Sequence, residues 1–413
     1  MRGVVVGAQE RPDDRDRRAK RGPATDDRAS PGGGGGSALD RDSAERRCRM
    51  SEALLWGLGL ATPKGTIAQA EAAALARELR GGQKEDGRAV EALYRRSGVR
   101  RRGSVLLEGA GWQGFFTPPG SEDDRGPSTG TRARVFEARA GELASEAARG
   151  ALVDAGIGAG EVTHLVTVSC TGMSAPGVDA ELIRGLGLSP RVARTNVGFM
   201  GCHGAINGLR VASAFAGGGG TVLVAAVELC SLHYHYGDDP EHAVANAIFA
   251  DGAAAAVVGP RDRRRSVGVV GGEVGMLARF GSVLVPGSAD AMGWRIGDHG
   301  FEMRLSVRVP ELIREHLRPW LGEWLGESGL RGDEVGGWAV HPGGPRVLGA
   351  VAESLGIGEA GVRHSTDVLA EHGNMSSPTV LFIADRLRRA GVPRPWVVLG
   401  FGPGLVAEGM LVM

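Results

Sequence analysis

Residues 142–169 read ELASEAARGALVDAGIGAGEVTHLVTVS, a helical pattern that leads through a glycine-rich turn into a short apolar strand. Residues 314–342 follow the same order, from REHLRPWLGEWLGESG through GLRGDEV to a strand in WAVHP. In both turns a glycine is followed by Ile or Leu, three further residues and Glu-Val. Alternating helix and strand patterns indicate an α/β fold, and the repetition predicts that it is built from two duplicated halves.

The repeated order continues beyond each strand. VDAELIRGLGL and then GCHGAINGLRVASAF follow the first strand, whereas PRVLGAVAESLGI and then HGNMSSPTVLFIADRL follow the second. On this interpretation Cys202 and Asn374 lie at equivalent helix N-termini, and His341 ends a strand of the second half. Three polar side chains then converge near one pseudo-twofold axis. The alternative is a chance similarity between common α/β patterns.

The two halves follow an atypical N-terminal stretch. Residues 1–50 are rich in Arg, Asp, Gly, Ser and Pro, and they hold almost no large apolar side chains. Such a segment buries too little surface to offset its ordering entropy, so we expect a disordered extension whose charges are solvated or contact an acidic partner. We expect the N-terminal half at 51–262 and the C-terminal half at 263–413.

Cys202 lies in VGFMGCHGAINGLRVASAFA, on a glycine-flanked turn where an extended segment passes into a helix. The first turn of a helix has unpaired N–H groups and a partial positive charge, which favour a thiolate. A nucleophilic sulfur is therefore one hypothesis. A small buried apolar residue, the usual role of a free cysteine, is the other.

His341 and Asn374 could supply the groups that a thiolate nucleophile needs. An imidazolium would stabilise the thiolate, and with a neutral amide it would donate hydrogen bonds to a developing oxyanion. His341 stands in HPGGP, at a strand end before a flexible turn. Taken singly, His341 is also compatible with a locally bonded turn histidine, and Asn374 with a helix N-cap.

The composition argues against several classes of protein. The 413 residues are 42% apolar, and Lys plus Arg balance Asp plus Glu at 48 each, so no overall charge points to nucleic acid or an anionic membrane. The four cysteines form no disulfide framework, which favours a reducing cytoplasm. The N-terminus lacks a secretory apolar region, and no uncharged apolar stretch reaches the roughly 20 residues of a membrane helix.

A metal site is another possibility for the histidines. His233, Tyr234 and His235 follow the strand pattern TVLVAAVELC, but a third ligand is missing nearby in the sequence. The Cys and His ligands of zinc sites occur in characteristic spacings, which this chain does not show. We therefore expect neither a metal nor a redox cofactor.

Four motifs together resemble one family. GFMGCHGA around Cys202, HPGGP around His341, GNMSS around Asn374 and GFGPG at 400–404 are similar to those of the chalcone and stilbene synthases, the type III polyketide synthases, with bacterial features. The resemblance extends from GLGLATP to GFGPGLVAEGM and so covers the chain after the N-terminal stretch. It implies a thiolase-like fold with αβαβα layers, a homodimer, and a Cys-His-Asn triad that acts on coenzyme A thioesters.

The resemblance also implies a reaction. Cys202 would accept a starter acyl group from acyl-CoA, while His341 and Asn374 would stabilise the enolate that malonyl-CoA forms when it loses carbon dioxide. Iterative decarboxylative condensation would extend the acyl chain, which would be cyclised or released as a pyrone, a resorcinol or a related aromatic. Decarboxylation supplies the driving force, so the family needs no cofactor.

Further positions are assigned by the resemblance alone. Phe249 matches one of two phenylalanines that line the cavity and gate the CoA tunnel, whereas Met303 replaces the other, which suggests a different or more adaptable starter. Of the basic residues that contact CoA, only Arg96 is matched. Cys170 is either a second functional thiol or a buried spectator. The remaining substrate-pocket positions are Cys230, His233, Trp294, Ser376, Gly402 and Pro403.

Three other classes of protein share part of this pattern. A ketoacyl-carrier-protein synthase III, which starts fatty acids, has the same fold and triad, but it more typically shows His-Gln-Ala-Asn at the histidine motif and a different C-terminal glycine loop. Papain-like proteases also have Cys, His and Asn in this order, but their glycine-serine-cysteine-tryptophan surroundings are missing here. A catalytically silent scaffold would retain the thiolase fold without the reaction.

Overall fold

The described part of the chain begins just after the predicted N-terminal extension. The computed structural model describes residues 53–80, 87–108, 112–237, 239–266 and 274–413. The expected extension at 1–50 therefore lies outside the described residues, and the expected boundary between the halves falls in α9 (Arg261–Ser266). Among the described helices, none has the length and apolar character needed to span a bilayer.

Five strands of the N-terminal half pair in the order β1-β7-β6-β4-β5. The β1-β7 and β7-β6 pairs are antiparallel, and the β6-β4 and β4-β5 pairs are parallel. The inner strands are almost entirely apolar and buried, as expected for strands with both faces covered. Their bounds are β1 (Ala53–Ala61), β4 (His164–Ser169), β5 (Ala193–Gly198), β6 (Val222–Leu229) and β7 (Asp251–Pro260).

Four strands of the C-terminal half repeat this pattern as β8 (Gly275–Leu284), β13 (Val406–Val412), β12 (Trp396–Gly402) and β11 (Gly337–Val340). The β8-β13 and β13-β12 pairs are antiparallel, and β12-β11 is parallel. The first three pairings of the N-terminal set therefore recur in the same order, which confirms the predicted duplication, and the β4-β5 pair has no counterpart among the described strands. β1 also pairs with β8 over two residues, so both sets belong to one nine-stranded sheet, a join that the sequence did not indicate.

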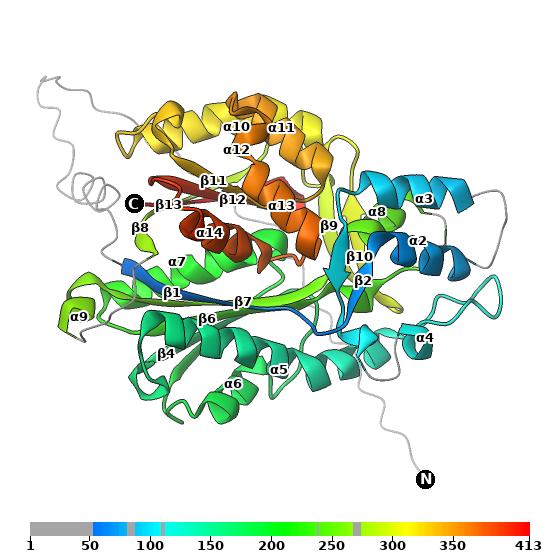
Figure 1. The fold of residues 1–413 in the computed structure, drawn as a ribbon, viewed down its shortest axis with the longest axis horizontal. Helices are drawn as coiled ribbons and strands as arrows, with labels where there is room; N and C mark the ends of the chain where they lie inside the picture. Colours follow the sequence, from blue (N-terminus) through cyan, green and yellow to red (C-terminus); the bar gives the residue numbers. More distant parts are fainter. Residues whose placement is uncertain (1–52, 81–86, 109–111, 238, 267–273) are drawn as a thin grey trace, which may run out of the picture. The chain divides into compact units, whose positions relative to one another are not determined.

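Helices cover the outer face of each set of strands (Figure 1). α5 (Thr129–Ala155) and α6 (Val178–Leu186) pack on the first set, and α10 (Val309–Gly326) and α11 (Pro345–Leu355) pack on the second. The long α5 starts at Ser128, whose hydroxyl caps the first turn, and ends at the left-handed Gly156. These are the helical halves of the repeat seen in the sequence.

A third layer of helices lies between the two sets of strands (Figure 1). It contains α7 (Gly204–Gly217) and α14 (Thr379–Arg389), whose apolar side chains join one core with inward-facing residues of both sets. Together with the outer helices this gives the predicted αβαβα layering. α7 and α14 are the helices that follow Cys202 and Asn374, so both candidate residues lie in the middle layer.

Smaller elements enclose one end of the middle layer. A hairpin of β9 (Met292–Gly297) and β10 (Gly300–Leu305) lies beside α8 (Pro240–Ile248), close to α2 (Gln69–Glu78) and α3 (Gly87–Arg96) (Figure 1). The remaining helices and strands are β2 (Thr66–Ala68), β3 (Arg101–Gly103), α4 (Trp112–Phe115), α12 (Gly358–Gly361) and α13 (Arg363–His372).

Candidate active site

Cys202 lies in a short 3-10 turn, Gly201–His203, between the edge strand β5 and the middle-layer helix α7. Gly201 has a φ of 68°, and a Cβ placed there would lie 2.6 Å from Cδ of Pro403. Only glycine combines this backbone conformation with such a close approach. The GFGPG loop after β12 therefore packs directly against the turn that carries the candidate nucleophile.

Asn374 follows α13 and is held by its own backbone. Its N–H donates to the Ile248 carbonyl (2.8 Å), and its carbonyl accepts from Ala250 N–H (2.9 Å), which makes a one-residue bridge with Phe249. The Asn374 side-chain oxygen accepts from the N–H of Ser376 (2.8 Å). The amide NH₂ is then the group that can donate, and its influence on the Cys202 thiol is to lower the pKa.

His341 ends β11, where its backbone N–H donates to the Leu399 carbonyl (2.7 Å). Its side chain is buried, with 1% exposed, and neither ring nitrogen has a hydrogen-bond partner among the described residues. Burial lowers the pKa of His341 to about 3. The imidazole is therefore neutral near pH 7, with both nitrogens available to a substrate or a neighbouring group.

The charge state of Cys202 differs from the sequence-based expectation. Burial raises the pKa of the thiol to about 12, although hydrogen bonds from Ser376 and Asn374 act in the opposite direction. The Ser376 hydroxyl lies 3.6 Å from the sulfur. Desolvation thus outweighs the helix N-terminus, and the resting pair is a thiol and a neutral imidazole rather than a thiolate and an imidazolium.

One cavity opens on Cys202 and is lined by eight of the nine pocket residues that the resemblance assigned. It also includes Thr171, Gly201, Met292 and Gly293, which sequence reasoning did not single out. We call it the thiol cavity. The eight residues are Cys170, Cys230, Phe249, Trp294, Met303, Ser376, Gly402 and Pro403. Their roles toward a substrate stay predictions.

A second, largely apolar cavity lies next to the first. It shares Cys230, Phe249, Trp294 and Met303 with the thiol cavity, so these four side chains form a common wall. It continues toward α2, α3 and α8, and its own lining includes the ninth predicted residue, His233. We call it the side cavity. This cavity was not predictable from the sequence, because its walls come from five separate segments.

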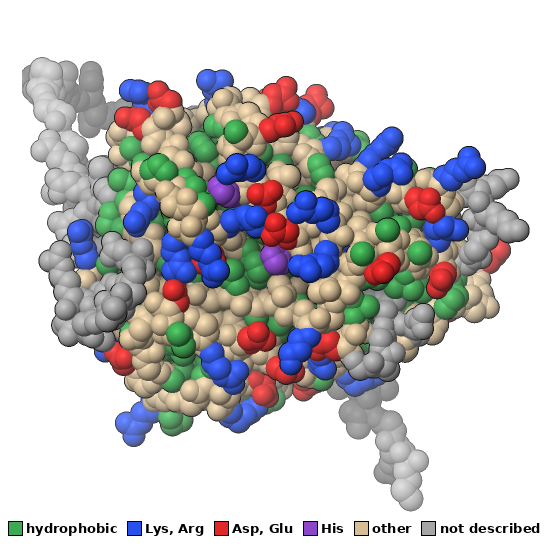
Figure 2. Space-filling model, in the orientation of Figure 1, with side chains coloured by type: hydrophobic (Ala, Val, Ile, Leu, Met, Phe, Trp, Pro, Cys, Tyr) green, Lys and Arg blue, Asp and Glu red, His purple; other side chains and the backbone are tan. Residues whose placement is uncertain are grey.

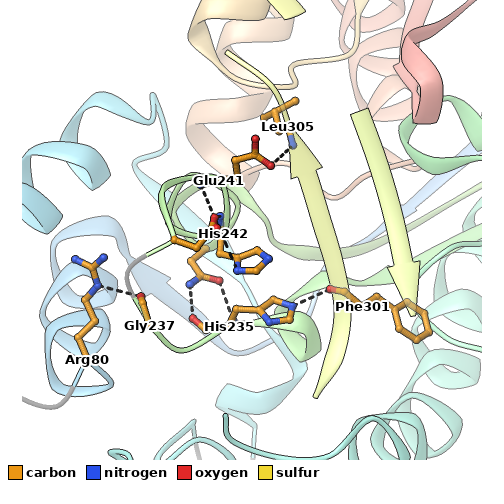
Figure 3. A network of polar contacts seen from close by, with 9 residues as sticks. Arg80, His235, Gly237, Glu241, His242, Phe301 and Leu305 are labelled. Atoms are coloured by element: carbon orange, nitrogen blue, oxygen red, sulfur yellow. Dashed lines mark hydrogen bonds and ion pairs between the residues drawn. The ribbon is translucent and has the colours of Figure 1, made fainter. Parts of the chain in front are cut away.

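The β9-β10 hairpin carries two of the shared wall residues in directly opposed positions, Trp294 and Met303. Trp294 Nε1–H donates to the Cys170 carbonyl (2.6 Å), which ties the hairpin to the end of β4. Figure 3 shows two further ties from the α8 region, where His235 contacts the Phe301 carbonyl (2.9 Å) and Glu241 accepts from Leu305 N–H (3.1 Å). These polar contacts therefore hold the hairpin, and with it Trp294 and Met303, in place.

His233 lines the side cavity only, and both of its ring nitrogens are hydrogen-bonded. Nδ1 accepts from the N–H of Phe301 (2.9 Å), so Nε2 carries the proton and donates to the Thr171 carbonyl (2.7 Å). The ring stacks on Phe301 at 4.3 Å, and burial lowers the pKa of His233 to about 3. His233 is thus a neutral connector between the halves.

Glu228 is a buried residue of β6 that sequence reasoning missed. Its carboxylate accepts from Ser377 Oγ (2.6 Å), Thr171 Oγ1 (2.7 Å) and Cys170 N–H (3.0 Å), and burial raises its pKa. It thereby links β4 to the Ser377 turn beneath the thiol cavity. The available signal was a single acidic residue inside the apolar run VLVAAVEL.

Arg96 lies at the exposed end of α3 and has no carboxylate partner in the described ranges. Two residues on, a Cβ at Gly98 would lie 3.0 Å from Pro345, so this end of α3 packs against the HPGGP loop. Elsewhere basic and acidic side chains are interspersed, as Figure 2 shows over the face with α13 and α14, where Arg386 pairs with Glu371 at 2.7 Å. Arg96 therefore remains available to an anion.

Comparisons with known proteins agree with this geometry. The models of the chalcone and stilbene synthases match here at residues 40–262 for the N-terminal domain and 277–413 for the C-terminal domain. An alpha-pyrone synthesis polyketide synthase-like protein of Mycobacterium tuberculosis is 32% identical over 87% of this chain and 90% of its own. A 1,3,6,8-tetrahydroxynaphthalene synthase of Streptomyces peucetius subsp. caesius is 37% identical over 65% of this chain and 72% of its own.

Solved structures give the same result. The crystal structure of PKS-I from the brown alga Ectocarpus siliculosus superposes with a TM-score of 0.79 at 30% identity, over 88% of this chain and 98% of the algal chain. Both predicted halves, their layering and the four motifs thus agree with one family. The chain belongs to the chalcone and stilbene synthase family of type III polyketide synthases, acyl-transferring condensing enzymes with a thiolase-like fold.

Proposed function

We propose that this enzyme loads an acyl starter from acyl-CoA onto Cys202, extends it with malonyl-CoA and cyclises or releases the product. The observation that carries this proposal is the thiol cavity, in which Cys202 and Ser376 lie within largely apolar walls, with the Ser376 hydroxyl 3.6 Å from the Cys202 sulfur. The names of the two relatives above support an aromatic or pyrone product.

Loading requires a proton transfer, because thiol and imidazole are both neutral at rest. The Cys202 proton moves to His341 while the sulfur attacks the acyl-CoA carbonyl, and CoA leaves as a thiolate. The proton stays on His341 as an imidazolium. This order of events separates the enzyme from proteins that hold a preformed thiolate.

Extension then uses the positive charge that loading left on the His341 imidazolium. Malonyl-CoA loses carbon dioxide, and the electron pair remains on an enolate whose oxygen accepts hydrogen bonds from the Asn374 amide and the His341 imidazolium. The enolate carbon attacks the Cys202 thioester, and the new carbon–carbon bond forms as the sulfur departs. The sulfur recovers its proton from His341, which completes the cycle without a resident cofactor or metal.

The shared wall of the two cavities supports a starter that differs from those of plant-like members. Met303 and Trp294 are paired across the two strands of the hairpin, and both line the thiol cavity. A flexible thioether and a rigid indole therefore lie side by side in its wall. Methionine adapts to ligands of different shape, whereas the Trp294 ring is fixed by its hydrogen bond. We therefore assign starter selection to this pair.

Arg96 is the proposed contact for a CoA phosphate. It is exposed, it lacks a carboxylate partner within the described part of the chain, and its helix end packs on the loop that follows His341. An arginine with these properties suits a phosphate group. CoA thioesters as substrates also favour the cytoplasm as the place of action.

A homodimer is proposed from the exposed edge of the sheet. β5 pairs with β4 on one side, and no strand of the described residues pairs with its other side. Met173 and Met200, on the segments that flank this edge, are 60% and 41% exposed. Open strand edges and exposed large apolar side chains are commonly covered by a partner. Sedimentation of the purified protein tests this, with a monomer contradicting it.

The central experiment gives purified protein malonyl-CoA together with a panel of acyl-CoA starters. We expect CoA release and formation of pyrones, resorcinols or related aromatics, identified by mass spectrometry. Acceptance of acyl-carrier-protein thioesters alone would favour a ketoacyl synthase that starts fatty acids. Absence of turnover with any thioester would favour a silent scaffold.

A further inference from the structure

A second buried histidine directly follows the candidate nucleophile. His203 is 3% exposed and closes the turn that carries Cys202. Its Nδ1 lies 2.6 Å from Asn207 Oδ1, one turn further along α7. Because an amide oxygen only accepts, Nδ1 must carry the proton. Nε2 then holds a lone pair, and it has no hydrogen-bond partner among the residues that the structure describes.

Two glycines of β12 make room for this imidazole. Gly400 and Gly402 are two residues apart and thus face the same side of the sheet. A Cβ at Gly400 would lie 2.9 Å from Cβ of His203, and a Cβ at Gly402 would overlap the Nε2 edge of the ring. The imidazole therefore occupies the space over β12 that two side chains would otherwise fill.

The parallel register brings His341 to the same place. Val340 pairs with Leu399, so His341 is in register with Gly400 on the neighbouring strand. Residues in register on parallel strands point to the same face. Val340 and Leu399 both belong to the outer core, which leaves His341 and Gly400 on the inner face, toward His203. Two buried imidazoles thus lie on the inner side of β12, and three of their four nitrogens have no hydrogen-bond partner among the described residues.

We propose that His203 is a positioning residue for His341: its Nε2 accepts a hydrogen bond, through one bridging water, from the His341 ring nitrogen that faces it. The other nitrogen of His341 then holds the lone pair that receives the Cys202 proton. When that proton arrives, the imidazolium donates through this water to His203 on one side and to the substrate oxygen on the other. Asn207 holds His203 in the required tautomer. The proposal rests on the acyl-loading role of Cys202 and His341 given above.

The charged groups near His203 do not prevent it from acting as a neutral hydrogen-bond acceptor for His341. Glu408 on β13 and Arg210 on α7 both act on His203, but they form an ion pair with each other and affect the pKa of His203 in opposite directions. Burial is the main influence on that pKa and lowers it, so His203 is a neutral acceptor. His203 is also the titratable group that influences His341, because a positive charge on His203 would lower the pKa of His341.

Alkylation of Cys202 by iodoacetamide tests the proposal without any substrate. The rate is followed against pH on the Cys202 peptide in the wild type, in His203→Phe, which fills the space without an acceptor, and in His203→Gln, whose amide oxygen reaches the former Nε2 position. Loss of the acceptor destabilises the imidazolium, so less thiolate forms at a given pH. We expect His203→Phe to react about tenfold more slowly near pH 7, with its profile moved to higher pH. His203→Gln should recover most of the loss.

Equal pH profiles in all three proteins would overturn the proposal, as would equal losses in both variants. If the variants fail to fold, nitrogen-15 NMR of wild-type histidines decides: we expect His203 protonated on Nδ1, and protonation on Nε2 would contradict us. Failure of the proposed function gives a different result. In that case the wild type accepts no acyl-CoA, but the rate of Cys202 alkylation can still depend on His203.

Discussion

The turn before α7 and the turn before α14 occupy equivalent positions in the two halves, yet they carry different chemistry. Each places a glycine with positive φ directly before its functional residue, Gly201 before Cys202 and Gly373 before Asn374. The first turn follows a full strand, β5, and opens on the thiol cavity. The second follows α13 and pairs with Phe249 through a single bridge.

This difference shows how a duplicated scaffold builds an asymmetric site. The same backbone feature positions the candidate nucleophile in one half and a hydrogen-bond donor in the other. Ser376, which comes from the second half, adds a hydroxyl 3.6 Å from the Cys202 sulfur. The comparison therefore predicts that changes in the two turns impair different steps of the reaction.

Removal of the nucleophile should have the largest effect. In Cys202→Ala we expect acyl loading and chain extension to disappear, because no other group of the mechanism forms the thioester. Product analysis by mass spectrometry with malonyl-CoA and an accepted starter measures this. Extension that persists in Cys202→Ala would show that another residue carries the acyl chain, with Cys170 and Cys230 as the nearest thiols of the cavity.

Removal of the donor should affect one step only. In Asn374→Ala we expect malonyl-CoA decarboxylation to fall about 100-fold, since one preformed donor to the enolate oxygen is lost. Loading of the starter on Cys202 should change by less than about tenfold. Carbon dioxide release and acyl-enzyme formation are measured separately. Equal losses in both steps would remove the distinction between the two turns.

The two glycines should resist substitution for the same reason. Gly201→Ala would place a Cβ 2.6 Å from Pro403, and Gly373→Ala would place one 2.9 Å from the Ala250 Cβ. We expect each to lower the free energy of unfolding by about 2–4 kcal/mol, as strain and overlap combine. Gly187 is the matched control, because it has the φ of Gly201, 68°, and open space around its Cβ position.

In Gly187→Ala we expect a loss of about 1 kcal/mol from backbone strain alone. Urea unfolding of the four proteins provides the comparison. A cost for Gly201→Ala no larger than that of Gly187→Ala would mean that the GFGPG loop does not hold the Cys202 turn in place.

The smallest effect is expected at the cavity wall. Met303→Phe should shift the preference among acyl-CoA starters several-fold while total turnover stays within about tenfold, because the ring narrows the wall opposite Trp294. Met303→Leu keeps a flexible aliphatic chain and serves as the control. An unchanged starter profile in Met303→Phe would remove Met303 from starter selection.

Sequence reasoning predicted the fold correctly and proposed three central residues, because repeats and motifs are local patterns. Helix and strand periods revealed the duplication, and the duplication brought Cys202, His341 and Asn374 together. The join between β1 and β8 was not predictable, since it rests on two residue pairs between distant strands. The side cavity was missed for a similar reason.

Charge states and buried polar partners also lay beyond the sequence. The helix N-terminus predicted a thiolate at Cys202, but desolvation depends on how many segments cover the sulfur, and here it raises the pKa instead. His203 was not singled out from the sequence, because only the close approach of Gly400 and Gly402 shows which space its ring fills. Glu228 was visible as an acidic residue in an apolar strand, but its partners come from β4 and the turn before α14.

The most direct test of the account is to locate the acyl group. Wild-type enzyme is incubated with an accepted acyl-CoA in the absence of malonyl-CoA, and the acylated peptide is identified by mass spectrometry. The account predicts one thioester, on the peptide that contains Cys202. An acyl group on Cys170 or Cys230, or product formation without any acyl-enzyme, would contradict it.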